Sequence, residues 1–184
     1  HAVEFVGEGI AQLTMDQRMS IANMTTEWGA LAGVFPCDEV LLTWLEDRAK
    51  WMAARGFPRY SAEDVSDWAG NPLAADADAT YAVGLSLDLG SVIPHVSGPD
   101  HVKVMHALPE IEAKRIAIQK AYVLSCVNGR LEDLQAAAAV VKGQHVADGV
   151  EFYVAAASAT IQAEAESDGT WGILADAGVI FLPP

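Results

Sequence analysis

The feature that most constrains this fold is a short polar run, residues 125–130, that separates a strand-like stretch from a helical one. Residues 118–124 form the strand-like stretch, whereas residues 131–141 are rich in alanine. The alternation continues with strand-like segments at 150–156 and 179–182 and helical segments at 160–166 and near 171–177. Strands that alternate with helices of this length predict a parallel sheet with right-handed crossovers. The predicted fold class is therefore α/β.

The first half of the chain predicts a second module of the same class. After a short strand at residues 3–6, Thr14 can form a capping box with Gln17 and begin a helix that runs to about Ala32. Further elements are expected from hydrophobic spacing: a short buried strand at 34–35, a helix at 39–54 and a half-buried strand at 83–89.

The segment between these modules has little periodicity. Residues 91–110 contain three prolines and one glycine, which interrupt regular structure and are common between domains. We therefore expect two domains, residues 1–90 and residues 111–184, joined by a linker at 91–110.

The charge balance excludes several classes of partner. Lys and Arg number 11 against 25 Asp and Glu, which gives a formal net charge of -14. Such a surface repels nucleic-acid phosphates and anionic lipids, and no apolar stretch is long enough to span a bilayer. Two distant cysteines do not make a disulfide framework, so a reducing compartment is expected.

The polar run at 125–130 carries the most specific chemistry. Cys126 offers a soft thiolate at the end of a strand, and Asn128 and Arg130 follow where a helix begins, which is suited to an iron-sulfur site beside an anionic substrate. On general behaviour, Cys126 is more often a small buried residue, and Asn128 a helix cap. The only other cysteine, Cys37, lies in no cysteine motif and is interpreted as structural.

Asn23 and Glu27 form a second candidate pair. They lie four residues apart on the first predicted helix and therefore point the same way. A hydrogen-bonded structural pair is one interpretation, and a polar site is the other.

A family resemblance extends these inferences. The run Ser-Cys-Val-Asn-Gly-Arg-Leu-Glu-Asp-Leu at 125–134 resembles the first cysteine motif of the aconitase superfamily, whose common form is Ser-Cys-Thr-Asn-Ser/Gly-Arg. Residues 3–9 and 14–30 are similar to a segment of homoaconitase and 3-isopropylmalate dehydratase large subunits, and residues 96–99 and 146–153 favour the homoaconitase branch. The resemblance implies aconitase-like three-layer α/β/α modules with parallel-rich sheets.

The same resemblance implies roles for the candidate residues. Cys126 would be one of three ligands of a [4Fe-4S] cluster, Asn23 and Glu27 would orient water or hydroxide on the free iron, and Asn128 and Arg130 would lie near the substrate. The other two cluster cysteines and the catalytic serine have no match in this sequence. We therefore expect a middle piece of a larger enzyme that alone is inactive and binds no cluster.

The reaction implied is the interconversion of homocitrate and homoisocitrate through cis-homoaconitate, in lysine biosynthesis. The alternatives are 3-isopropylmalate dehydratase, in leucine biosynthesis, and a non-catalytic stand-alone module. Expected partners are the remaining domains of the enzyme or a small swivel-domain subunit, with a tricarboxylate or dicarboxylate substrate. The location would be mitochondrial for a fungal homoaconitase and cytoplasmic for a prokaryotic one.

Overall fold

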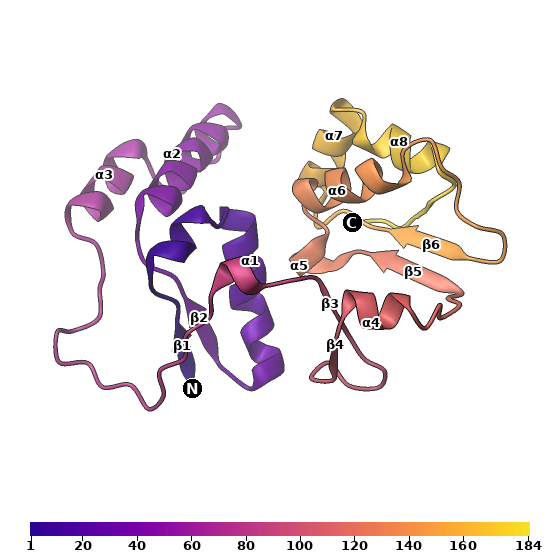
Figure 1. The fold of residues 1–184 in the computed structure, drawn as a ribbon. Coiled ribbons are helices and arrows are strands. Elements are labelled where there is room, and N and C mark those ends of the chain that lie inside the picture. The colour runs from indigo at the N-terminus through magenta and orange to yellow at the C-terminus, as the bar shows by residue number, and fades with distance from the viewer. The chain divides into compact units, whose positions relative to one another are not determined.

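The computed structural model describes residues 1–184, apart from the side chain of Cys126. It divides into two compact units, His1–Pro94 and His95–Pro184, which are described separately below (Figure 1). The division falls inside the segment 91–110 in which the sequence predicts a linker. None of the described helices is both long and apolar enough to cross a membrane.

The first unit is built on two parallel strands. β1 (Ala2–Glu4) pairs with β2 (Ala32–Val34), and α1 (Met15–Met24) lies between them in the chain after a short 3-10 helix, η1 (Glu8–Gln12). The capping box predicted at Thr14 and Gln17 is confirmed. α1 packs closely on β2, because a Cβ at Gly33 would come within 2.9 Å of the backbone of α1.

The first helix is shorter than the sequence predicts. α1 ends at Met24 and is followed by a 3-10 helix, η2 (Thr25–Trp28), rather than continuing to about Ala32. The hydroxyls of Thr25 and Thr26 donate to the carbonyls three residues earlier, at 2.8 and 2.9 Å, which tightens the turn. Gly29 then adopts a left-handed conformation with φ of 88° and ends the helix.

Two capped helices complete the regular part of this unit. α2 (Glu39–Ala54) begins after Asp38, whose side chain accepts from the amide of Leu41, and α3 (Ala62–Gly70) begins with a capping box at Ser61. Val65 of α3 is 1% exposed.

The strand predicted at residues 83–89 is not formed, so that prediction is wrong. The structure has no strand or helix from residue 71 to residue 88, and the next element is a 3-10 helix, η3 (Leu89–Ser91). The apolar side chains of this stretch face solvent, and Leu85 is 91% exposed. Alternating hydrophobicity produces a strand only where a partner edge is present, and none of the described strands pairs with this stretch.

The second unit begins with a small antiparallel hairpin. β3 (His95–Ser97) pairs with β4 (Met105–Ala107), and α4 (Leu108–Glu112) follows directly. The hairpin, its loop and α4 together run from residue 95 to residue 112 and so include most of the segment in which the sequence shows little periodicity.

The main sheet of this unit is parallel, as predicted. Its order is β5 (Lys120–Val123), β6 (Glu151–Val154) and β7 (Ile180–Phe181). The connecting helices are α5 (Ser125–Asn128), α6 (Leu131–Val141), α7 (Ala159–Ser167) and α8 (Thr170–Asp176). Figure 1 shows α6, α7 and α8 gathered on one side of the sheet. The predicted α/β class is confirmed.

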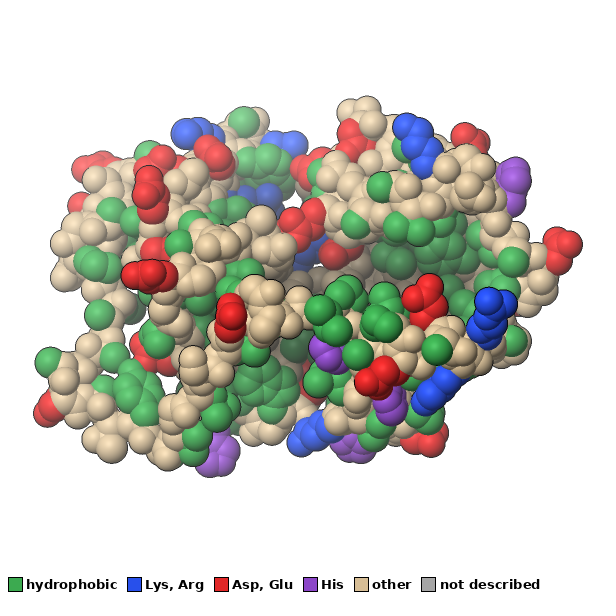
Figure 2. Space-filling model, viewed as in Figure 1, with side chains coloured by type: hydrophobic (Ala, Val, Ile, Leu, Met, Phe, Trp, Pro, Cys, Tyr) green, Lys and Arg blue, Asp and Glu red, His purple; other side chains and the backbone are tan. Residues whose placement is uncertain are grey.

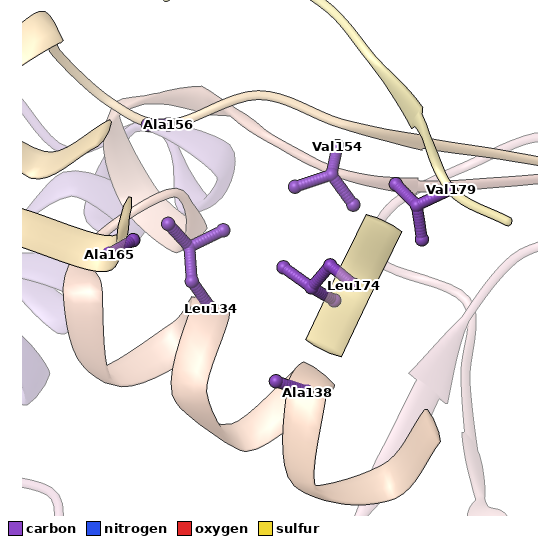
Figure 3. Packing of buried hydrophobic residues seen from close by; sticks show 7 residues of the cluster. All are labelled: Leu134, Ala138, Val154, Ala156, Ala165, Leu174 and Val179. Atoms are coloured by element: carbon purple, nitrogen blue, oxygen red, sulfur yellow. The ribbon is translucent and has the colours of Figure 1, made fainter. Parts of the chain in front are cut away.

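The core of the second unit lies between the sheet and these three helices. Leu134 of α6, Val154 of β6 and Leu174 of α8 are fully buried and converge in Figure 3. The opposite face of the sheet is more exposed to solvent. Tyr122 and Tyr153 stack there, with ring centroids 5.2 Å apart, and Tyr122 is 55% exposed. Figure 2 shows acidic side chains scattered among exposed apolar ones on the face in view.

Candidate functional site

The candidate site begins where β5 ends. Leu124 is extended, and Ser125 then adopts a φ of 92°, which residues with a β-carbon rarely do. The Ser125 hydroxyl accepts a 3.3 Å hydrogen bond from the amide of Val127 across this turn. The turn leads directly into α5. A non-glycine residue in this conformation is a feature that often accompanies functional loops.

Cys126 is the second residue of α5, so its backbone lies at the carboxyl end of a parallel strand. This is the edge where open α/β sheets gather ligands. Its side chain lies outside the described residues, and its expected role as a cluster ligand stays a prediction. Cys37 is a half-buried free thiol in the first unit.

Asn128 and Arg130 are joined through a third residue, Asp133. The Asn128 side-chain amide donates to one carboxylate oxygen of Asp133 at 3.3 Å, and the Arg130 backbone amide donates to the other at 3.1 Å. Asp133 is the third residue of α6 and therefore spans the loop between α5 and α6. Asp133 was not predicted from the sequence, although an acidic residue three positions after a helix cap is the signal of such an interaction.

Gly129 fixes this loop against the next strand. Its carbonyl accepts from the amide of Ala157 at 2.7 Å, just beyond the end of β6. A Cβ at this position would lie 2.7 Å from the carbonyl oxygen of Ser125 and 2.9 Å from that of Ala155, so the close approach depends on glycine. The loops that follow β5 and β6 are thus in direct backbone contact.

Asn23 and Glu27 lie in the first unit, and the chain changes from α-helix to 3-10 helix between them. Asn23 is exposed and Glu27 half-buried, so the cost of burying a polar pair does not arise in this chain. The Thr26 hydroxyl lies 2.9 Å from both the Asn23 carbonyl and Oε2 of Glu27, which ties the two residues locally. Their predicted catalytic roles remain predictions.

The described side chains include no group of three or more His, Cys, Asp or Glu residues arranged to hold a metal ion. The one predicted metal ligand, Cys126, is the residue whose side chain is not described. The loop therefore defines a backbone position for a thiolate, flanked by Asn128, Arg130 and Asp133.

A family model for the aconitase family (aconitate hydratase) matches this chain over residues 1–184. The chain belongs to the aconitase family, as its sequence predicts.

Three similar proteins are fungal homoaconitases. The chain is 51% identical to the mitochondrial homoaconitase of Eremothecium gossypii, 48% to that of Debaryomyces hansenii and 47% to that of Candida albicans, each over 100% of its length. It covers 27%, 26% and 27% of these proteins, respectively. The chain thus spans about a quarter of the length of the curated relatives it matches.

Proposed function

We propose that this chain is part of a homoaconitase-like hydro-lyase that interconverts homocitrate and homoisocitrate through cis-homoaconitate. The observation that carries the proposal is its 47–51% identity to fungal homoaconitases along its whole length. The names of these relatives favour this reaction over that of 3-isopropylmalate dehydratase.

The aconitase family implies a [4Fe-4S] cluster in the complete enzyme. The loop after β5 is suited to supply one ligand of such a cluster, because Cys126 lies at a sheet edge beside the exposed residues Ser125 and Asn128. The loop cannot hold the cluster by itself, since the cluster of this family is held by three cysteines and the loop provides one thiolate. When bound, the cluster supplies a Lewis acid that polarises the hydroxyl leaving the substrate.

The residues of this chain would bind and orient around that centre. The Arg130 guanidinium can hold a substrate carboxylate through two parallel hydrogen bonds, and Asn128 can hydrogen-bond a second substrate oxygen. Such local positive charge is needed because the chain carries a net charge of -14 and repels an anionic substrate at long range. Asn23 and Glu27 would orient the water or hydroxide that is added or removed.

We further propose that the remaining residues of the reaction lie outside this chain, on other domains of the same enzyme or on a small swivel-domain subunit. This chain alone would then be inactive and would not retain a cluster. The names of the fungal relatives support a mitochondrial location for a fungal protein.

The test is an assay of the complete protein of which this chain would form part. After anaerobic reconstitution with iron and sulfide, we expect homoisocitrate and homocitrate to yield cis-homoaconitate, with 3-isopropylmalate a much poorer substrate. Preference for 3-isopropylmalate would replace the proposed substrate with the alternative one. A reconstituted protein that holds no iron and turns over neither substrate would support the non-catalytic module instead.

A further inference from the structure

Asp133 joins the candidate site to α6 through two hydrogen bonds. Both of its carboxylate oxygens accept hydrogen bonds from residues just before α6, one at 3.3 Å from the side chain of Asn128, the last residue of α5, and one at 3.1 Å from the Arg130 backbone amide. It projects from the first turn of α6, which also carries the fully buried Leu134. The loop is thus connected to a helix that is anchored in the core.

The two hydrogen bonds of Asp133 do different things. The bond from the Arg130 amide satisfies a backbone donor at the start of α6, which is ordinary helix capping. The bond from Asn128 satisfies no backbone donor of α6, because its donor is the side chain of the last residue of α5. It fixes the direction of a side chain two residues after Cys126, in a turn that already contains the positive φ of Ser125.

We propose that Asp133 is a positioning residue for the Cys126 loop, residues 125–130: its carboxylate orients the Asn128 amide and holds the backbone of this loop, from which the Cys126 thiolate would reach a cluster, in its observed conformation. This inference rests on the proposed function for its chemical consequence. Its structural part concerns the loop itself and can be measured without a cluster.

Asp133→Asn separates positioning from capping. The side-chain oxygen of the new asparagine can still accept from the Arg130 amide, so the helix cap is kept. Its NH2 group would face the NH2 group of Asn128, so that hydrogen bond is lost. The double variant Asn128→Asp with Asp133→Asn exchanges donor and acceptor and restores the bond in reverse.

The first measurement is amide hydrogen exchange of residues 124–131 in the iron-free complete protein. We expect Asp133→Asn to accelerate exchange there by about tenfold and the double variant to restore protection. Ser61→Ala is the control, because it removes a helix cap from α3 in the other unit without touching this loop. Unchanged exchange in Asp133→Asn, or acceleration in Ser61→Ala of the same size, would overturn the proposal.

The second measurement is the rate of iron loss from the reconstituted complete protein in air, together with the electron paramagnetic resonance spectrum of the oxidised cluster. We expect Asp133→Asn to lose iron several-fold faster than wild type and to broaden the spectrum, with Ser61→Ala unchanged. Wild-type iron retention in Asp133→Asn would refute the positioning role of Asp133 and leave the proposed function standing. Failure of the wild-type protein to hold iron would instead refute the proposed function, and the exchange data would still decide the structural part.

Discussion

Arg18 of α1 donates from Nη1 and Nη2 to the two carboxylate oxygens of Asp38, each at 2.7 Å. Nη2 also donates to the carbonyl of Ile10 at 2.8 Å. The Arg18 side chain is 1% exposed and that of Asp38 is 27% exposed. The pair therefore ties α1, which carries Asn23, to the start of α2.

Asp38→Asn tests how much this pair stabilises the chain. Asparagine is also a good helix N-cap, so the change removes the charge while it keeps an acceptor for the Leu41 amide. Arg18 would be left as a buried cation without its counter-ion, which should lower the free energy of unfolding by about 2–4 kcal/mol. The loss is smaller than for a fully buried pair because Asp38 is partly exposed. Chemical denaturation at pH 7 measures this. The control is Asp47→Asn, since the Lys50–Asp47 pair is exposed and should contribute less than about 1 kcal/mol.

The same pair predicts a pH dependence. The hydrogen bond from Arg18, followed by the bond from the Leu41 amide and the nearby positive charge, lowers the pKa of Asp38 below its ordinary value of 3.8, although burial opposes the shift. A carboxyl group with a lowered folded-state pKa contributes stability above its unfolded pKa and loses it as pH falls through the folded one. The difference in the free energy of unfolding between wild type and Asp38→Asn should therefore be complete at about pH 5–7, above the ordinary carboxyl pKa, and should shrink below about pH 4. A difference that stayed constant down to pH 2 would contradict the role of the Asp38 charge.

Two leucines, one buried and one exposed, should differ greatly in how much their truncation destabilises the chain. Leu174 is fully buried in the core of the second unit, whereas Leu85 is 91% exposed in the unpaired stretch of the first. Leu174→Ala should destabilise the chain by about 2–5 kcal/mol, and Leu85→Ala by less than about 0.5 kcal/mol. Denaturant titration of the two variants side by side measures both. A loss of about 2 kcal/mol or more at Leu85, as large as that of a core truncation, would mean that this side chain is buried in solution.

Local signals in the sequence predicted much of the fold. The capping box at Thr14 depends on residues close in sequence, and the parallel β5–β6–β7 sheet was predicted from strands and helices that alternate along the chain; both are found. The strand at residues 83–89 failed because its hydrophobic period says nothing about a partner edge. The end of α1 was misplaced because the hydroxyls of Thr25 and Thr26 compete for helix carbonyls, which a hydrophobic pattern does not register.

The candidate site was predicted less completely than the fold. The motif located the loop of Cys126, Asn128 and Arg130 at the end of a strand, as the structure has it. It did not reveal that Asp133 connects two of these residues, because that link depends on the path of the loop between α5 and α6. Nor did it reveal the full steric need for Gly129, because part of that need comes from the backbone of Ala155 and Ala157, just after β6 and more than twenty residues further along the chain.

The isolated chain should not hold a tetranuclear cluster. Only Cys126 lies in a cysteine motif of the family, and a [4Fe-4S] cluster needs several thiolates. Anaerobic reconstitution of the 184-residue chain, followed by iron quantification and visible absorption, should therefore show far less than four irons per chain. Near-stoichiometric incorporation of four irons per chain would defeat this expectation, unless two chains were shown to share one cluster.

Cys126→Ser in the complete enzyme is the most direct test of the ligand assignment. A serine hydroxyl is a hard donor with a high pKa, whereas the cluster favours soft sulfur, so the variant should lose most of its iron and its activity. The volumes of the two side chains are similar, so the far-UV circular dichroism spectrum should be nearly unchanged. Cys37→Ser is the matched control and should keep turnover within a few-fold, because Cys37 is a half-buried free thiol of the first unit. Wild-type iron and turnover in Cys126→Ser would mean that this cysteine only packs, and the cluster site would then have to be sought elsewhere in the complete protein.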